Sequence, residues 1–460
     1  MLSFVAALAM ALPAPPTVPL ELNSTNPHYF RYKGKPTVLI TSGEHYGAVM
    51  NLDFPHQPYL DTLKKDGLNL TRLFSGVYCE DPRAFNIREN TMAPGPGRYI
   101  SPWARSTTPG YANGGNKFDV TKWDDSYFKR LKSFCKEAEK RGIIVEVVLF
   151  CPFYKDSMWN LSPMNAQNNV NGIGTMPRGE VYTLKHKAMV DLHDSVTTRI
   201  VNELRDAPNI YYEICNEPYF GGVTLDWQQH ISETIAKAES TFPQKHLIAQ
   251  NIANDWAKVT SPNPNVSIFN FHYASPPRAV TENYNLNRPI AFDETGFKGS
   301  DDFTYRAQAW EFLLAGGSVF SNLDYSFTTA KPDGTMPVAP PTPGGGSPAY
   351  RNQLGILKKF MDSLDFIHMS PDRSSIKFIQ PLGITAYLLS SPGKAYAVYL
   401  RGDTASSMGI ELPSGRYDLE WVDTKTGEVS GKQTFKHDGG VRNLTMPTYT
   451  QDIAFRIRRK

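Results

Sequence analysis

The chain has 460 residues and a formal net charge of only +3, so we expect neither a nucleic acid nor an acidic membrane surface as a partner. Its four cysteines are too few for a disulfide scaffold, and none of them has the Cys-x-x-Cys spacing of a zinc or redox site. The length allows two or three domains, or one large barrel with a smaller companion.

The first element is an apolar run at residues 2–12, followed by Pro13-Ala14-Pro15-Pro16. The run is too short to span a bilayer. It has the apolar core and small residues of a secretory signal, but no Lys or Arg precedes that core. We interpret residues 1–16 as an export signal or disordered N-terminus, which predicts a secreted or periplasmic protein. The alternative is a disordered apolar start to a cytoplasmic protein.

From residue 37 onward, short apolar or β-branched runs alternate with amphipathic helical patterns such as 127–141 and 185–204. This alternation predicts an α/β protein, and eight repeats of it predict a (β/α)8 TIM barrel, which we place at residues 17–371. A small hairpin at 29–38 precedes the first strand and is expected to plug the barrel floor. The predicted strands are 37–42, 69–74, 143–150, 209–215, 246–250, 267–271, 289–293 and 318–324.

Three connections, at 77–118, 152–183 and 327–347, are far longer than the usual few residues. All three follow predicted strands, so they should rise from the C-terminal mouth of the barrel, where long loops usually carry binding function. Loop length does not fix direction. The loops either wall off a pocket at the mouth or fold outward and leave an open groove.

After residue 372 the pattern changes to alternating strands with Gly/Pro turns, which predicts a small all-β sandwich at 372–460. Trp421 is the only tryptophan in this region, and a buried aromatic is commoner than an exposed binding platform. We therefore expect this domain to stabilise the barrel rather than to capture substrate.

Two of the predicted barrel strands end in a glutamate at a turn signal. Residues 211–218 read Tyr-Tyr-Glu-Ile-Cys-Asn-Glu-Pro, and residues 290–296 read Ile-Ala-Phe-Asp-Glu-Thr-Gly. The C-terminal ends of parallel barrel strands meet at one mouth, so Glu217 and Glu294 should lie there together. Two carboxylates in that position are what glycoside hydrolysis requires, one as proton donor and one as nucleophile or base.

The neighbouring carboxylates on the same two strands have other expected positions. Strand alternation puts Glu213 on the same side as Glu217 but deeper, where we expect a buried, ion-paired structural group. The same alternation predicts that Asp293 points to the face opposite Glu294 and does not share its role.

The two strand-end strings resemble the acid/base and nucleophile strands of the retaining glycoside hydrolases of clan A, especially the cellulase-like family 5. The resemblance implies a TIM barrel with a C-terminal β-sandwich and hydrolysis of a β-linked glycoside or oligosaccharide by double displacement. It implies Glu217 as acid/base and Glu294 as nucleophile, a carbohydrate as the partner, and neither cofactor nor metal.

Two further residues match motifs of the clan. Arg72 ends the second strand in Gly-Leu-Asn-Leu-Thr-Arg, similar to Gly-x-Asn-x-x-Arg, and its guanidinium would keep the nucleophile ionised. Asn216 would bind the sugar hydroxyl beside the reacting carbon. The alternatives are an arginine exposed at the rim and a turn-forming asparagine before proline.

The sixth and first strands match the clan less closely. Family members usually place a tyrosine on strand six, often two residues after a histidine, that contacts the nucleophile. Here His272 and Tyr273 are adjacent, so which of them makes the contact stays open. The first strand ends in Glu44-His45-Tyr46, which we expect to bind a non-reducing-end sugar, with a histidine that only orients its neighbours as the alternative.

Strand eight departs from the family, whose members commonly carry a tryptophan platform there, whereas this chain reads Asn-Leu-Asp-Tyr at 322–325. Among the loop aromatics, Trp159 and Trp256 are candidates to stack on sugars, although any one aromatic is more often core. The missing platform and the long loops together predict an exo-acting enzyme. A transglycosylase on the same site and a catalytically inactive carbohydrate-binding barrel are the alternatives.

Overall fold

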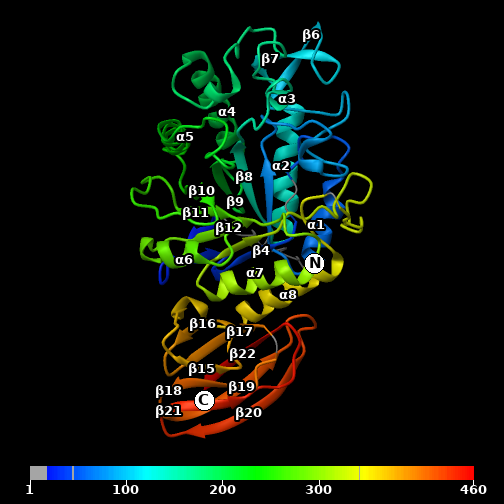
Figure 1. Ribbon diagram of the computed structural model, residues 1–460. Helices are drawn as coiled ribbons and strands as arrows, with labels where there is room; N and C mark the ends of the chain where they lie inside the picture. The colour runs from blue at the N-terminus through cyan, green and yellow to red at the C-terminus, as the bar shows by residue number, and fades with distance from the viewer. Residues whose placement is uncertain (1–17, 44–45, 341, 403) are drawn as a thin grey trace, which may run out of the picture.

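The computed structural model describes residues 18–43, 46–340, 342–402 and 404–460 (Figure 1). Eight parallel strands form one sheet that curls into a barrel, as predicted, in the order β4-β13-β12-β11-β10-β9-β8-β5. The export signal predicted within residues 1–16 lies outside the described residues, as do Glu44 and His45. The barrel strands are β4 (Leu39–Thr41), β5 (Leu70–Phe74), β8 (Ile144–Phe150), β9 (Ile210–Cys215), β10 (Ile248–Asn254), β11 (Ile268–His272), β12 (Ile290–Glu294) and β13 (Val319–Ser321).

The seam between β4 and β5 is joined by Asn69, the residue before β5. Its side-chain oxygen accepts a hydrogen bond from the Ile40 N–H at 2.9 Å, and its amide donates to the Val38 carbonyl at 2.9 Å. The Asn69 backbone N–H also donates to the Ile40 carbonyl at 3.2 Å. An asparagine side chain therefore supplies the pairing that the short strand β4 cannot.

Helices pack around the barrel, and their starts follow local capping rules. Asp124 accepts hydrogen bonds from the first turn of α2, and Ser347 does so for α8, which has a proline in its first turn. The helices are α1 (His56–Lys65), α2 (Asp125–Lys140), α3 (Asp156–Trp159), α4 (Lys187–Glu203), α5 (Leu225–Ala238), α6 (Arg278–Asn283), α7 (Asp302–Leu314) and α8 (Pro348–Asp362). Single 3-10 turns lie at Ala84–Asn86, Arg178–Glu180, Tyr284–Leu286 and Phe366–His368.

The barrel floor is closed by a small antiparallel sheet of β1 (Glu21–Leu22), β2 (Phe30–Tyr32) and β3 (Lys35–Thr37). Side chains of this sheet form one buried cluster with an apolar residue from every barrel strand. The hairpin predicted at 29–38 is therefore a plug. The polar side chains of the barrel interior lie above this apolar floor, in the upper layers and at the mouth.

The first long connection carries a β-hairpin that the sequence pattern missed. Strands β6 (Trp103–Pro109) and β7 (Asn116–Trp123) pair antiparallel, and the segment 110–115 between them ends in Asn-Gly-Gly. Gly114 and Gly115 both have positive φ, at 88° and 82°, which is the backbone conformation that such turns need.

The C-terminal region forms two antiparallel sheets, one of six strands in the order β14-β16-β17-β22-β19-β20 and one of three in the order β15-β18-β21. They enclose a core of their own, in which Trp421 is buried and so presents no binding platform. The strands are β14 (Ser370–Pro371), β15 (Ile376–Gln380), β16 (Thr385–Ser391), β17 (Ala395–Arg401), β18 (Ser407–Leu412), β19 (Gly415–Val422), β20 (Val429–His437), β21 (Gly440–Thr445) and β22 (Asp452–Arg459).

Helix α7 joins the barrel to this sandwich, which lies below it in Figure 1. The Arg306 guanidinium on α7 makes a buried two-point ion pair with Asp452, at 2.9 and 2.8 Å, and the Tyr399 hydroxyl donates to the same carboxylate. Trp310 stacks on Tyr399 with ring centroids 5.6 Å apart. Buried charge and aromatic packing therefore hold the two parts together.

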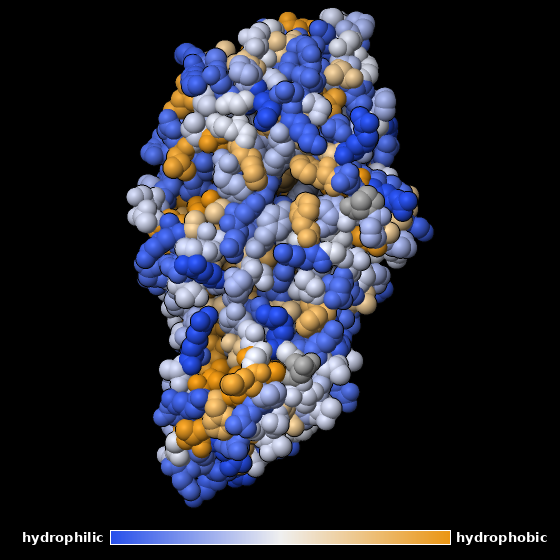
Figure 2. Space-filling view, viewed as in Figure 1, coloured by the Kyte–Doolittle hydropathy of each residue, from blue (hydrophilic) through white to orange (hydrophobic). Residues whose placement is uncertain are grey.

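The surface in Figure 2 is largely polar, with a hollow in the barrel half that apolar side chains partly surround. Across the described ranges, no helix combines the length and the apolar character needed to cross a membrane.

Candidate active site

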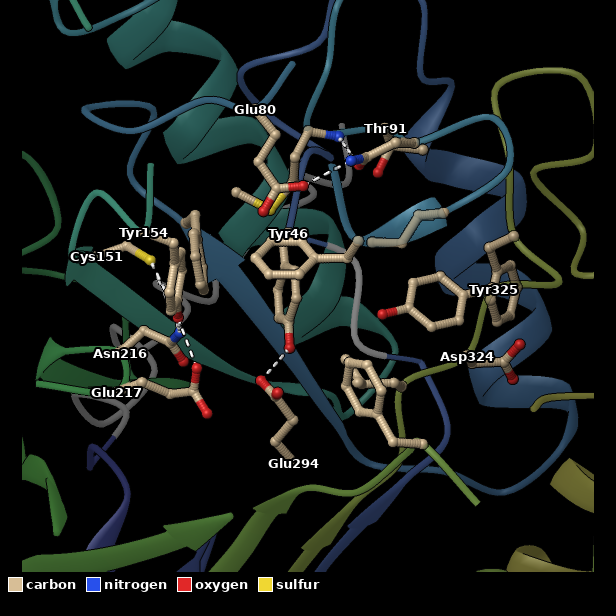
Figure 3. A pocket seen from close by; sticks show the side chains of 18 of the residues that line it. Tyr46, Glu80, Thr91, Cys151, Tyr154, Asn216, Glu217, Glu294, Asp324 and Tyr325 are labelled. Carbon is tan, nitrogen blue, oxygen red and sulfur yellow. Dashed lines mark hydrogen bonds between the residues drawn. The ribbon is translucent and has the colours of Figure 1, made fainter. Parts of the chain in front are cut away.

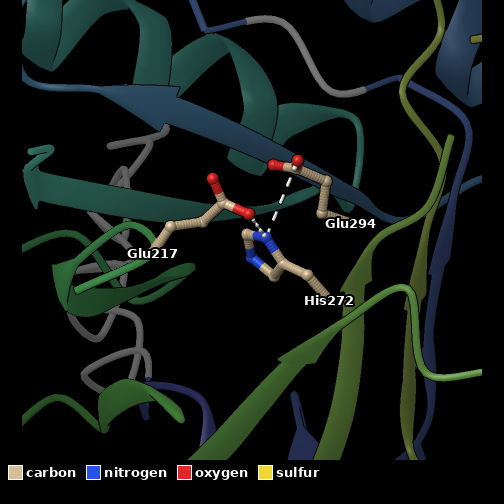
Figure 4. A group of neighbouring side chains, drawn as sticks. All are labelled: Glu217, His272 and Glu294. Carbon is tan, nitrogen blue, oxygen red and sulfur yellow. Dashed lines mark hydrogen bonds and ion pairs between the residues drawn. The ribbon is translucent and has the colours of Figure 1, made fainter. Parts of the chain in front are cut away.

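Glu217 and Glu294 lie at the mouth of the barrel, directly after β9 and at the end of β12. Both are largely buried, with exposed fractions of 7% and 6%. An oxygen of each carboxylate and a ring nitrogen of His272 all lie within 4.8 Å of one another. Figure 4 shows the two carboxylates converging on the imidazole. Glu217 has a left-handed φ of 37°, a strained conformation for a residue with a side chain and one that clusters at functional sites.

Three groups hydrogen-bond the Glu294 carboxylate. The Tyr46 hydroxyl donates to Oε2 at 2.6 Å, and the Tyr273 hydroxyl donates to Oε1 at 2.5 Å. The Arg72 guanidinium lies 3.2 Å from Oε2. On strand six it is therefore Tyr273, rather than its neighbour His272, that makes the hydrogen bond to Glu294. The left-handed φ of Tyr273, 52°, lets both adjacent side chains face the site.

Glu217 receives three hydrogen bonds of its own. Tyr154 donates to Oε2 at 2.7 Å, His272 Nδ1 lies 3.1 Å from Oε1, and Tyr219 donates to Oε1 at 3.2 Å. Burial by itself would raise the pKa of Glu217. The hydrogen bonds and the charge of His272 outweigh burial, so the pKa of Glu217 lies below its ordinary value.

His272 is fully buried, and burial disfavours its charged form. The surrounding carboxylates Glu294, Asp293 and Glu217 outweigh this and raise the pKa of His272 to about 10. The imidazolium therefore holds a proton next to Glu217 in the free enzyme. The side-chain amide of Asn251 contacts the other ring nitrogen of His272.

A layer of buried charge supports the mouth from beneath, with the Arg72 guanidinium at its centre. Glu213 lies 2.7 Å from Arg72 Nη2, and Glu146 lies 3.3 Å from Nε. Glu213 is thus the buried, ion-paired group that strand alternation predicted. Burial raises the pKa of Glu146 well above its ordinary value, so this layer holds fewer negative charges than carboxyl groups.

The prediction that Asp293 points away from Glu294 is wrong. The Asn270 amide donates to Asp293 at 2.6 Å, and His272 Nε2 lies 3.6 Å from its carboxylate, so Asp293 faces the barrel interior. The pairing of β11 with β12 shifts register between Phe271 and His272, and this irregularity breaks the strict alternation. Burial raises the pKa of Asp293 to about 6.

Asn216 bonds to Arg72, which contacts Glu294, and to Tyr154, which contacts Glu217. Its side-chain oxygen accepts from Arg72 Nη2 at 2.9 Å, and its amide donates to the Tyr154 hydroxyl at 2.9 Å. These two bonds fix the rotamer next to Glu217. Tyr154, which follows β8, contacts both Asn216 and Glu217, a role that no motif in the sequence indicates.

A pocket opens over the two glutamates (Figure 3). Strand-end residues form its base, and the first long loop forms a wall through residues 80–92. Tyr325 and Phe327, where the third long connection begins, line it as well. At the rim, Phe297 is 54% exposed and has a left-handed φ of 59°. The loop length left open whether this loop would wall off a pocket or fold outward, and Phe297 belongs to no motif that would have indicated it.

The two tryptophans proposed as sugar platforms do not line this pocket. Trp159 is buried against Phe153, with ring centroids 4.9 Å apart. Trp256 is half-buried, and the Arg278 guanidinium covers one face of its ring at 3.2 Å from the centroid. Of the three residues predicted at the end of strand one, the described part of the chain contains only Tyr46, which contacts Glu294.

Two sets of three described side chains have ligand atoms close enough to hold a metal ion, Glu217 with His272 and Glu294, and Glu146 with Glu213 and Asp293. Arg72 contacts members of both sets. Its permanent positive charge opposes a cation at either position.

The family model Cellulase (glycosyl hydrolase family 5) matches residues 32–311, which is more than half of the chain. A comparison with curated proteins found no match.

Solved structures share the fold at low sequence identity. A protein from Bacteroides vulgatus ATCC 8482 that is provisionally titled a glycoside hydrolase is 14% identical, with a TM-score of 0.70 over 96% of this chain and 82% of its own. A family 5 glycoside hydrolase from the same organism is 14% identical, with a TM-score of 0.62 over 96% and 94%. The family 5 mannosidase of Rhizomucor miehei is 14% identical, with a TM-score of 0.50 over 75% and 99%. These structures share the fold, and the family model over residues 32–311 shows that the chain belongs to glycosyl hydrolase family 5 and is a glycosidase.

Proposed function

We propose that this glycoside hydrolase cleaves β-linked glycosides with retention of configuration, with Glu294 as nucleophile and Glu217 as acid/base. The observation that carries the proposal is the approach of a Glu217 oxygen to a Glu294 oxygen, within 4.8 Å. Retaining enzymes separate their carboxyl groups by about 5–5.5 Å, whereas inverting enzymes leave about 6.5–9.5 Å for a water molecule. The short separation supports direct attack by the enzyme.

In the first step Glu294 attacks the anomeric carbon while the bond to the leaving oxygen breaks. Hydrogen bonds from Tyr46 and Tyr273 and the charge of Arg72 orient the Glu294 carboxylate for this attack. The leaving oxygen takes a proton from Glu217, which draws it from His272 Nδ1 at 3.1 Å. The pair of Glu217 and His272 thus supplies one proton, whichever of the two carries it at rest.

In the second step water replaces the leaving group. Glu217, now without its proton, accepts one from that water as it attacks the anomeric carbon, and the bond to Glu294 breaks. The proton taken from water returns the Glu217–His272 pair to its starting state. Asn216, fixed by Arg72 and Tyr154, is positioned to bind the 2-hydroxyl of the sugar in both steps.

We also propose that the enzyme removes sugars from chain ends. The support is the wall formed by residues 80–92, which turns inward and lines the pocket above Glu217 and Glu294. A walled pocket surrounds a terminal sugar and excludes an internal one by steric clash. Exposed Phe297 at the rim offers an apolar face for the leaving group.

The experiment is a screen of 4-nitrophenyl β-glycosides, including the β-mannoside because one structural neighbour is a mannosidase. The best substrate is then hydrolysed in an NMR tube, and the anomer that forms first is identified before mutarotation. A β product supports retention. An α product from a β-glycoside would contradict it.

A further inference from the structure

Glu80 is a buried carboxylate in the pocket that the proposed chemistry does not use. It lies in the first long loop, is only 7% exposed, and lines the pocket together with Asn90. Figure 3 shows Glu80 on the other side of Tyr46 from Glu217 and Glu294. It therefore lies in the wall that faces the catalytic pair.

The Glu80 carboxylate is held by two donors and has capacity for more. Tyr78 donates to Oε1 at 3.1 Å, and the Asn90 amide donates to Oε2 at 2.6 Å. The Asn90 oxygen accepts from the Met92 N–H at 2.9 Å, which turns its amide toward Glu80. An ionised carboxylate has about four acceptor positions, so each oxygen retains one beyond its present donor.

The loop around Glu80 is anchored before any ligand arrives. The Glu80 N–H donates to the Met92 carbonyl at 2.9 Å, and the Asn51 amide donates to the Thr91 carbonyl at 3.0 Å. Gly47 packs so closely that an added Cβ would lie 2.2 Å from the same Thr91 oxygen. A wall fixed in this way presents its polar groups in a defined geometry.

The Glu80 carboxylate has hydrogen-bond donors but no cationic partner among the described residues. No Lys, Arg or His of the described residues forms an ion pair with Glu80, whereas the deeper Glu213 is paired with Arg72. Burial raises the pKa of Glu80 to about 7, against the effect of its two donors. Ionised Glu80 is therefore costly in the free enzyme, and additional hydrogen-bond donors would lower that cost.

We propose that Glu80, oriented by Asn90, recognises the terminal sugar by accepting hydrogen bonds from hydroxyl groups remote from the cleaved bond. The ligand class is a neutral pyranoside, because Glu217 and Glu294 already make the pocket acidic. The inference rests on the proposed hydrolysis and identifies the group that selects the sugar. The 2-hydroxyl is excluded, since Asn216 lies beside the reacting centre to bind it.

The test compares wild type with Glu80→Gln on the preferred 4-nitrophenyl glycoside and on its 2-, 3-, 4- and 6-deoxy analogues. We expect Glu80→Gln to lower kcat/KM on the parent substrate about tenfold or more, as for a lost hydrogen bond to a charged group. With wild type, kcat/KM for one of the 3-, 4- or 6-deoxy analogues should be lower than for the parent substrate by a similar factor. With Glu80→Gln, kcat/KM for the same analogue should fall by less than about threefold, because the variant no longer makes the interaction.

The 2-deoxy analogue is the internal control, and its kcat/KM should be lower than that of the parent substrate by the same factor with both enzymes. Each comparison is a ratio within one protein, so partial misfolding of the variant cancels. Asp81→Asn is the matched control variant, since Asp81 instead accepts from Ser157 and the Arg83 N–H, and it should behave as wild type. Equal losses for every analogue in wild type and Glu80→Gln would overturn the proposal. No turnover of any glycoside by wild type would instead refute the proposed function.

Discussion

Nδ1 of His272 lies 3.1 Å from Oε1 of Glu217, close enough for the two side chains to share one proton. The carboxylates around His272 raise its pKa to about 10, while the hydrogen bond and charge of His272 hold the pKa of Glu217 below its ordinary value. Glycosidase acids usually have raised pKa values of their own. In the proposed mechanism the imidazolium stores the proton and the Glu217 carboxylate delivers it.

Replacing His272 should therefore move the alkaline limb of the pH–rate profile. In wild type the shared proton should stay bound through neutral pH and be lost only as pH rises toward the raised pKa of His272. In His272→Asn a lone carboxylic acid must hold the proton, so kcat/KM should begin to fall at least about one pH unit lower.

The profile is measured from pH 4 to 10 with an aryl glycoside that has a poor leaving group, because its cleavage depends on protonation. His230→Asn is the control, since His230 lies on the outer helix α5 and bonds to Asp194. An alkaline limb that does not move in His272→Asn would show that His272 is not the proton store.

Removing the proposed acid/base, Glu217, should lower kcat by different factors on different substrates. Glu217→Ala should lower kcat by about 10²–10⁴-fold on a glycoside with a poor leaving group and far less on a 2,4-dinitrophenyl glycoside, which needs little proton donation. Added azide should restore turnover by attacking the intermediate in place of activated water. Equal losses on both substrates, without azide rescue, would argue against this role for Glu217.

The sandwich should stabilise the barrel through the buried pair of Arg306 and Asp452. Asp452→Ala leaves the Arg306 charge buried and unpaired, which should cost about 3–5 kcal/mol of the free energy of unfolding. Urea unfolding measures the loss, and Asp418→Ala, on the exposed face of β19, is the control that should change little. Truncation before Asp372 should leave little soluble protein. A soluble truncated enzyme with full activity on small substrates would contradict this view.

Digestion of a β-linked oligosaccharide should release one small sugar from the start. The wall at residues 80–92 should block internal binding, so the viscosity of a long polymer should fall slowly. Products are followed over time by chromatography. Early products of mixed length with a rapid fall in viscosity would show that the pocket admits internal sugars.

The barrel could be predicted from the sequence because strand and helix patterns repeat along the chain. The proximity of Glu217 to Glu294 could be predicted because each lies at the end of a barrel strand. It placed Asp293 wrongly because the register shift between β11 and β12 leaves no local signal. It could not separate a core tryptophan such as Trp159 from a platform, since that difference depends on long-range packing. Glu80 was not predicted, because its place in the pocket comes from the fold of a loop and not from a motif.

The most direct test of the catalytic pair is to trap the intermediate. The enzyme is incubated with a 2-deoxy-2-fluoro sugar of its preferred configuration that carries an activated leaving group, and the labelled peptide is identified by mass spectrometry. We predict one added glycosyl group on the peptide containing Glu294, and no label in Glu294→Gln, which should also lose roughly 10⁴-fold or more in turnover. A label on another residue, or wild-type turnover by Glu294→Gln, would contradict the assignment of Glu294 as the nucleophile.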